Sequence, residues 1–224
     1  MKTRFLTTVC ALLTLAVLLG GCSAGAEKAP KKEVGIQLYS VRSLIGAFGN
    51  NQEDYKPVLK QLADMGYTSV EAASYKDGKI YGQTPEQFRK DVEEAGMKVL
   101  STHCTINLSD EELAAGDFSK ALAWWDECIA AHKAAGAEYI VVPSMRKIST
   151  LKDLQTYCRY FNEVGARCAA AGMKFGYHNH SREFEKIEDK VMLDYMLENT
   201  DPDKVLFEMD VYWTVMGKAS PVDY

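Results

Sequence analysis

The chain has 224 residues, of which 47% are apolar and 25% are charged, and this composition excludes collagen-like, coiled-coil and largely disordered proteins. Its formal net charge is −5, from 26 basic and 31 acidic residues. An acidic chain without a basic stripe binds phosphate backbones poorly, so we expect no nucleic-acid partner.

The chain begins with a segment that has the pattern of a secretory leader. Lys2 and Arg4 form a basic start, and a nearly continuous apolar run follows over residues 5–19. The run is shorter than the ~20 apolar residues that cross a bilayer, which favours a signal peptide over a membrane-spanning helix. We expect residues 1–21 to be removed, which changes the balance to 24 basic and 31 acidic residues, or −7.

Cys22 directly follows this leader, in the string Leu19-Gly20-Gly21-Cys22. The string resembles the lipobox of bacterial lipoproteins, in which the cysteine is acylated and becomes the new N-terminus. The alternative is an ordinary signal peptide with an incidental cysteine. Residues 22–33 are small, polar and basic, which is typical of a flexible tether. We therefore expect an exported lipoprotein that contacts the membrane only through its lipid anchor, on the periplasmic or cell-surface side.

The four cysteines that follow the tether are Cys104, Cys128, Cys158 and Cys168. No two of them have the close C-x-x-C spacing of a zinc or redox motif. An exported chain can oxidise a cysteine pair, but free cysteines in helical segments are mostly small core residues. We therefore expect no essential disulfide.

An amphipathic helix, a glycine and a short apolar strand recur along the chain. The glycines that end the helices are Gly66, Gly96, Gly136 and Gly172, at intervals of 30, 40 and 36 residues. Glycine just past a helix adopts the left-handed conformation that ends it, and these intervals have the length of one β-α unit. The predicted strands are 34–40, 69–73, 98–103, 138–143, 174–180 and 205–210; the predicted helices are 55–65, one that begins at 84, 118–135, 151–171 and 189–198.

This alternation predicts an α/β fold with a parallel sheet. A doubly wound sheet is expected to carry a G-x-G-x-x-G turn after its first strand, and the corresponding string LYSVRSLIGAFGN has none. A (β/α)8 barrel needs about 250 residues, and 203 of the 224 follow residue 21. We therefore predict that residues 34–224 form an incomplete TIM barrel with about six of the eight β-α units, cut short at the C-terminus. The doubly wound sheet remains the alternative.

Polar residues gather at the carboxyl ends of the predicted strands, where α/β folds bind their ligands. Alternate residues of a strand point to the same face, so His178 shares a face with His180, and Glu208 with Asp210. Imidazoles and carboxylates that converge at one edge favour a divalent cation such as Zn²⁺, Mn²⁺ or Co²⁺. Each residue alone has an alternative, as a hydrogen-bonded structural histidine or a capping carboxylate. Other strand-end candidates are Gln37, Tyr39, Glu71 and His103.

Three strings, GIQLYSVR, YHNH-x-x-EF and FEMDVYW, resemble the sugar phosphate isomerase/epimerase family, whose members have a xylose isomerase-like TIM barrel. The second string resembles a branch that is rich in exported bacterial lipoproteins. The resemblance covers residues 34–224. It implies a divalent metal ion (Mn, Zn, Co or Mg) held by Glu or His and Asp of strands five and six and by His and Glu of strands seven and eight. The last two strands have no counterpart here, so the resemblance implies a weakened metal site.

Carried over residue by residue, the resemblance places His178 and Asp210 at the metal ligands of strands five and six. Glu71 and His103 match positions that relatives use for substrate contact or proton transfer. His180 is expected to act beside them as a catalytic residue, as a replacement ligand or as a partner of a substrate hydroxyl.

Substrate contacts are also expected near the strand ends. Gln37 and Tyr39 lie at the end of the first strand, and Trp213 is placed to stack on a sugar face or to pack under the loop. Glu183 is expected either to bind a substrate hydroxyl or to orient His180.

The activity implied by the resemblance is isomerisation or epimerisation of a carbohydrate through an enediolate. The cation polarises a carbonyl, a base removes the neighbouring proton, and reprotonation gives the product. Loss of a β-substituent would instead cleave a keto-glycoside. The alternative function is a lipid-anchored carbohydrate-binding protein without turnover. A DNA-repair endonuclease of related fold is disfavoured by the acidic charge and by export, and an oligomer is possible.

Overall fold

The computed structural model describes residues 33–51 and 54–224, and the residues from Glu33 onward form one unit. The expected signal peptide, the lipidation site at Cys22 and nearly all of the expected tether lie outside the described residues. No helix in the described ranges is long and apolar enough to cross a membrane.

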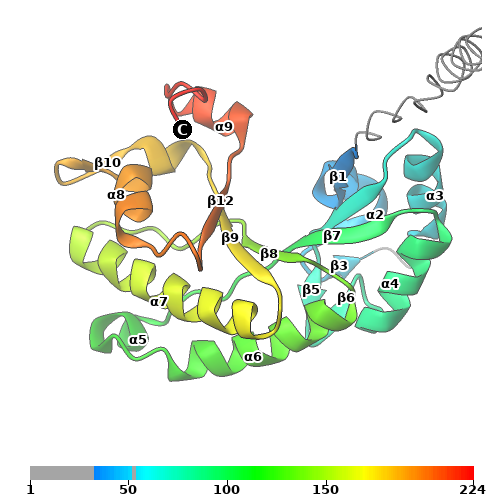
Figure 1. Ribbon diagram of the computed structural model, residues 1–224, viewed down its shortest axis with the longest axis horizontal. Coiled ribbons are helices and arrows are strands. Elements are labelled where there is room, and N and C mark those ends of the chain that lie inside the picture. The colour runs from blue at the N-terminus through cyan, green and yellow to red at the C-terminus, as the bar shows by residue number, and fades with distance from the viewer. Residues whose placement is uncertain (1–32, 52–53) are drawn as a thin grey trace, which may run out of the picture. The chain divides into compact units, whose positions relative to one another are not determined.

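A six-stranded parallel sheet forms the centre of the described part (Figure 1). Each strand pairs with the next strand of the β-α series, without a change of direction along the sheet. A doubly wound sheet would reverse its order at a switch point, so this order is that of a barrel. The sheet is a half-barrel with β1 and β12 at its edges, which confirms the predicted fold class. The strands are β1 (Gly35–Gln37), β4 (Ser69–Ala72), β7 (Lys98–His103), β8 (Tyr139–Val142), β9 (Lys174–His178) and β12 (Leu206–Glu208).

Helices flank this sheet, and the predicted ones lie within a few residues of their expected bounds (Figure 1). Thr84 caps the second of them, because its Oγ1 accepts a hydrogen bond from the backbone N–H of Gln87 at 3.2 Å. The glycines at 66, 96, 136 and 172 all have positive φ, as the predicted helix ends require. The helices are α3 (Lys56–Asp64), α4 (Pro85–Glu94), α6 (Ser119–Ala134), α7 (Leu151–Ala170) and α8 (Met192–Asn199).

Several short elements in the loops were not predicted from the sequence. They comprise three two-stranded hairpins, three short helices and two 3-10 turns. They are η1 (Leu38–Val41), α2 (Arg42–Ile45), β2 (Gly46–Ala47), β3 (Asn50–Asn51), β5 (Tyr75–Lys76), β6 (Lys79–Ile80), α5 (Asp110–Ala115), η2 (Ser181–Phe184), β10 (Lys186–Ile187), β11 (Lys190–Val191) and α9 (Val211–Met216).

An aromatic core joins the sheet to the long helices. The ring of Phe175 on β9 lies 5.6 Å from Trp125 of α6 and 5.8 Å from Phe161 of α7, and all three side chains are buried. The indole N–H of Trp125 donates to the Tyr160 hydroxyl at 2.6 Å, so its one polar atom is satisfied. This packing holds β9, and with it the histidines at its end, in a fixed position.

Candidate functional site

Glu208 and His178 lie side by side on neighbouring strands. They are register partners of β12 and β9, and the Glu208 carboxylate accepts a hydrogen bond from His178 Nδ1 at 2.8 Å. This bond places the proton on Nδ1 and leaves the lone pair of His178 on Nε2. Nε2 faces Asp210 Oδ2 at 3.6 Å.

The Asp210 carboxylate is held in place by the start of α9. Its Oδ1 accepts the backbone N–H of Trp213 at 2.9 Å and caps the helix. The side chain of Asn179 binds the backbone N–H and carbonyl of Asp210 at 2.9 and 3.3 Å. These bonds fix the backbone and one carboxylate oxygen, and the other oxygen faces His178.

Burial and pairing oppose each other in setting the ionisation of this pair. Burial by itself raises the pKa of Glu208, but hydrogen bonds from His103 and His178 outweigh it and hold that pKa well below its ordinary value. Burial by itself lowers the pKa of His178, but the hydrogen bond and charge of Glu208 outweigh it, and the pKa is raised. Glu208 is therefore an anion that stabilises the proton on His178.

His103 stands between two carboxylates. Its Nε2 is 3.0 Å from Glu71 Oε1 and 3.2 Å from Glu208 Oε1, and only 5% of its side chain is exposed. Because both neighbours accept hydrogen bonds, Nε2 carries the proton and Nδ1 carries the lone pair. The imidazole at the end of β7 can therefore accept a proton at Nδ1.

Glu71 is the most heavily constrained carboxylate of the group. It accepts hydrogen bonds from Gln37 Nε2 at 2.7 Å and from the Ser101 hydroxyl, in addition to its contact with His103. Burial raises its pKa, with a further contribution from the charge of Glu208, and the opposing effect of His103 does not cancel the shift. Glu71 lines a hollow of about 410 Å³ along the strands, and its contacts with the strand-end residues His103 and Gln37 link it to the carboxyl ends of the strands.

A cavity of about 710 Å³ opens at the carboxyl ends of the strands. Its polar lining groups include His103, His178 and Asp210, and its aromatic ones are Tyr39, Phe48 and Trp213. Carbohydrate sites commonly combine a few fixed polar groups with apolar ring faces in this way. The remaining lining residues are Gln37, Ala73, Thr105, Pro143, Ser144, His180, Ser181 and Arg182.

His180 lies between His178 and the aromatic side chain of Trp213. Its ring centroid lies 5.0 Å from that of His178 and 5.2 Å from that of Trp213. Burial and then the neighbouring His178 lower the pKa of His180, which favours the neutral imidazole. Its Nδ1 is buried and has no hydrogen-bond partner among the described residues, so this atom is free to bind a ligand.

Glu183 is fully buried below His180 instead of lining the cavity. It accepts the backbone N–H of His180 at 2.8 Å, the Tyr177 hydroxyl at 2.7 Å and the Arg182 Nε at 2.9 Å. Of the two roles expected from the sequence, the geometry supports the one in which Glu183 orients His180.

The donor set at the end of β9 and β12 fits a divalent cation. Two ligand atoms that each lie about 2.1 Å from one ion are roughly 3.0–3.6 Å apart, and His178 Nε2 and Asp210 Oδ2 are 3.6 Å apart. A histidine ligand commonly donates its other ring N–H to a carboxylate, as His178 does to Glu208. His180 has an unpartnered Nδ1, but it does not form with His178 and Asp210 a set whose ligand atoms all lie within 4.8 Å of one another. His103, His178 and Glu208 do form such a set.

The structure brings most of the predicted site residues to this cavity. Glu71 and Glu183 do not line it but contact residues that do, His103 and His180. The predicted residues that line it are Gln37, Tyr39, His103, His178, His180, Asp210 and Trp213. Sequence reasoning did not single out Ser101, Phe48 or Arg182, and it placed Glu208 beside Asp210 without giving it a role of its own. For Glu208 the signal was present, since it lies two residues before Asp210 on the same strand face.

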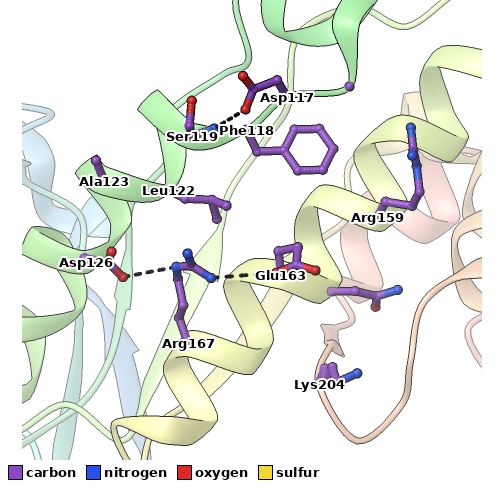
Figure 2. A pocket seen from close by; sticks show the side chains of 12 residues that line it. Asp117, Phe118, Ser119, Leu122, Ala123, Asp126, Arg159, Glu163, Arg167 and Lys204 are labelled. Carbon is purple, nitrogen blue, oxygen red and sulfur yellow. Dashed lines mark hydrogen bonds and ion pairs between the residues drawn. The ribbon is translucent and has the colours of Figure 1, made fainter.

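A second hollow, of about 800 Å³, lies on the outer surface beside α6 and α7 (Figure 2). Three of its six charged residues pair with one another: Arg167 contacts Asp126 at 3.1 Å and Glu163 at 3.7 Å. The hollow contains no histidine or cysteine. The strand-end cavity is therefore the better candidate for chemistry.

Comparisons with known proteins agree with the barrel fold. The profile of a protein family described as "Xylose isomerase-like TIM barrel" matches residues 59–223. Two crystal structures of sugar phosphate isomerase/epimerase proteins from Parabacteroides distasonis ATCC 8503 are similar to the chain. One is 32% identical with a TM-score of 0.72, over 89% of this chain and 72% of that one. The other is 34% identical with a TM-score of 0.75, over 86% of this chain and 74% of that one.

A more distant solved structure is similar in fold alone. It is an IOLI protein "with a binding zinc atom", 11% identical with a TM-score of 0.61, over 84% of this chain and 66% of that one. No functionally curated protein is detectably similar to the chain.

Proposed function

The chain belongs to the xylose isomerase-like TIM barrel family, and we propose that it is a divalent-metal-dependent sugar isomerase or epimerase that removes a proton next to a carbonyl. One observation carries the proposal: Glu208 fixes the Nδ1–H of His178 and directs Nε2 toward Asp210 Oδ2. His178 and Asp210 would hold the cation. When bound, the cation would polarise a sugar carbonyl and acidify the neighbouring C–H.

His103 is the proton-transfer group in this proposal. It lines the cavity and presents Nδ1 as a base, while Glu71 and Glu208 share the proton on Nε2. These carboxylates stabilise the imidazolium that forms when Nδ1 accepts a proton. Glu71 is accordingly a positioning residue, and its partners Gln37 and Ser101 keep it in place. Reprotonation at the other carbon isomerises the sugar, and reprotonation from the opposite face epimerises it.

An uncharged sugar suits the cavity better than a sugar phosphate. Among the described lining residues, the only lysine or arginine is Arg182. Its guanidinium already donates to Glu183 and to the carbonyl of Met145. A phosphate would therefore enter without an unpaired cation, whereas Trp213 and Tyr39 offer ring faces to a sugar. A keto-sugar or keto-glycoside is the substrate class that we propose.

The setting of this site is also part of the proposal. The leader and Cys22 support an exported lipoprotein that is anchored by its lipid, and the YHNH-x-x-EF string supports a branch of such proteins. The chain spans about three quarters of the length of the two Parabacteroides relatives.

Exchange of a carbon-bound proton tests the proposal. The protein is incubated in D₂O with a keto-hexose or its phosphate ester, with Mn²⁺ or with a chelator, and deuterium is followed by NMR. We expect exchange that requires the metal, prefers the unphosphorylated sugar and is lost in His103→Gln. Glu71→Gln is expected to retain some exchange with an altered pH profile. Sugar binding with no exchange in any arm would instead identify a carbohydrate-binding protein without turnover.

A further inference from the structure

Two buried cysteines lie in contact on the other side of β7 from the candidate site. Cys104 is the residue directly after His103, and Cys128 lies in the middle of α6. Their sulfur atoms are 3.2 Å apart, although the residues are 24 positions apart in the sequence. Cys104 is 6% exposed and Cys128 is fully buried. No other pair of described cysteines has its sulfur atoms in contact.

A histidine one helical turn further along α6 completes the cluster. His132 Nδ1 donates to the backbone carbonyl of Cys128 at 2.7 Å and lies 3.3 Å from the Cys128 sulfur. Since the carbonyl can only accept, the proton is on Nδ1, and the bare Nε2 has no partner among the described residues. His132 Nδ1, which carries the proton, therefore offers no lone pair to the Cys128 thiol, although Cys104, Cys128 and His132 have ligand atoms within 4.8 Å of one another.

The thiols are shielded from reagents once the chain has folded. Burial, followed by the contact with Cys104, raises the pKa of Cys128 well above its ordinary value, so the folded protein holds it as a thiol. Thiol–disulfide exchange requires a thiolate and access to the sulfur atom. A covalent link between the two residues must therefore form while this part of the chain is packing.

We propose that Cys104 and Cys128 form a disulfide when the chain folds in contact with a disulfide oxidant, and that the bond fastens the loop after His103 to α6. The oxidant is a small disulfide such as oxidised glutathione, or a dithiol–disulfide oxidoreductase. One cysteine thiolate attacks it and releases one thiol; the second cysteine then attacks the mixed disulfide and releases the other. The two cysteines lose two protons and two electrons, and the oxidant becomes two thiols.

The consequence concerns the site as well as stability. The bond would close a loop that contains all of α5, which restricts the unfolded chain and stabilises the fold. It would also anchor the backbone next to His103, whose ring must stay between Glu71 and Glu208. The inference draws on the proposed export for its oxidising compartment, but the test below supplies the oxidant directly and does not measure turnover.

The experiment refolds the full chain from guanidinium chloride in oxidised glutathione or in dithiothreitol. Free thiols are alkylated, the protein is digested without reduction, and the peptides are identified by mass spectrometry, which reports each cysteine separately. We expect a peptide pair joined through Cys104 and Cys128 in the oxidised sample alone. We also expect the oxidised protein to melt several degrees above the reduced one.

Matched variants give the expected shift a control. Cys168→Ala removes another buried thiol and should leave both the linked peptides and the difference in melting temperature unchanged. Cys104→Ser and Cys128→Ala should each abolish the linked peptides and the difference in melting temperature. If one of these variants fails to fold, the other still tests the proposal. Alkylation of both cysteines after oxidative refolding overturns the proposal, as does random pairing that includes Cys158. If Cys104 and Cys128 resist alkylation only until a chelator is added, the proposal is also overturned, because the cluster would then be a metal site.

Discussion

The Glu208 carboxylate accepts a hydrogen bond from His178 Nδ1 at 2.8 Å, and this bond turns His178 Nε2 toward Asp210 at 3.6 Å. The two residues are register partners on adjacent parallel strands, so the backbone ladder itself sets their distance. The same carboxylate oxygen lies 3.2 Å from His103. One partly buried anion therefore orients both the proposed metal ligand and the proposed base.

Removing the Glu208 carboxylate should weaken metal binding without removing a ligand. We expect Glu208→Ala to lower Mn²⁺ or Zn²⁺ affinity roughly 10- to 100-fold, because His178 loses the partner that fixes its tautomer. Glu208→Gln keeps an accepting oxygen and should lose less. Titration calorimetry measures both, and Glu198→Gln on the exposed side of α8 is the control. Equal affinity in all variants would remove Glu208 from this role.

Asp210 has two separable functions, a helix cap and a proposed metal ligand. Asp210→Asn keeps the cap on the Trp213 N–H and should change thermal stability little, while divalent metal content falls. Asp210→Ala should lose the metal and, in addition, about 1 kcal/mol of stability from the cap. Metal analysis combined with thermal melting separates the two effects. His178→Ala should also lower the metal content, and unchanged stoichiometry in all three variants would contradict the assignment.

His132 should make the stability of the protein fall in mild acid. Burial lowers its pKa from 6.5 to about 4, more than its hydrogen bond to Cys128 raises it. Between these values the unfolded chain binds a proton that the folded chain does not, so stability is complete above pH 6.5 and decreases as the pH falls toward 4. The loss is about 3 kcal/mol at most. Urea unfolding at several pH values measures it, and His132→Leu should flatten this part of the profile; an unchanged slope would refute it.

We predict lipidation at Cys22, the residue directly after the expected leader. Cys22→Ser should move the protein from the membrane fraction to the soluble fraction, because the thiol is the expected attachment point. Cys10→Ser, which changes a cysteine inside the apolar run, should leave the protein in the membrane fraction. Fractionation followed by immunoblotting distinguishes the two. A Cys22→Ser protein that stays in the membrane would disprove the lipoprotein assignment.

The main elements could be predicted because local signals agree with the fold. Gly66, Gly96, Gly136 and Gly172 each end a helix with positive φ, and Thr84 caps the helix predicted to start there. The strand predicted at 98–103 has the bounds of β7. The short helix α5 was missed although its capping box, Ser109 with Glu112, is visible in the sequence. Its few residues carry no periodic apolar pattern that would mark a helix.

The site was harder to predict. How far a side chain lies below the carboxyl ends of the strands depends on strand register, and the sequence does not encode register locally. Glu71 lies within the predicted strand 69–73 and His103 ends the predicted strand 98–103, and of the two only His103 lines the cavity. Glu208 and Asp210 share a strand face in the sequence pattern. In the structure, where α9 begins directly after Asp210, the two carboxylates have different partners. Glu208 bonds to His178 Nδ1, and Asp210 faces His178 Nε2. Contacts of this kind arise only once neighbouring strands have been aligned.

The position of a bound cation tests the central claim most directly. The protein is crystallised with Mn²⁺, and the ion is located from its anomalous scattering. We expect the peak at about 2.1–2.2 Å from both His178 Nε2 and Asp210 Oδ2, with Glu208 still bonded to Nδ1. A peak on the other side of the imidazole, among His103, Glu208 and His178 Nδ1, would contradict the account, because the proposed base would then be a ligand.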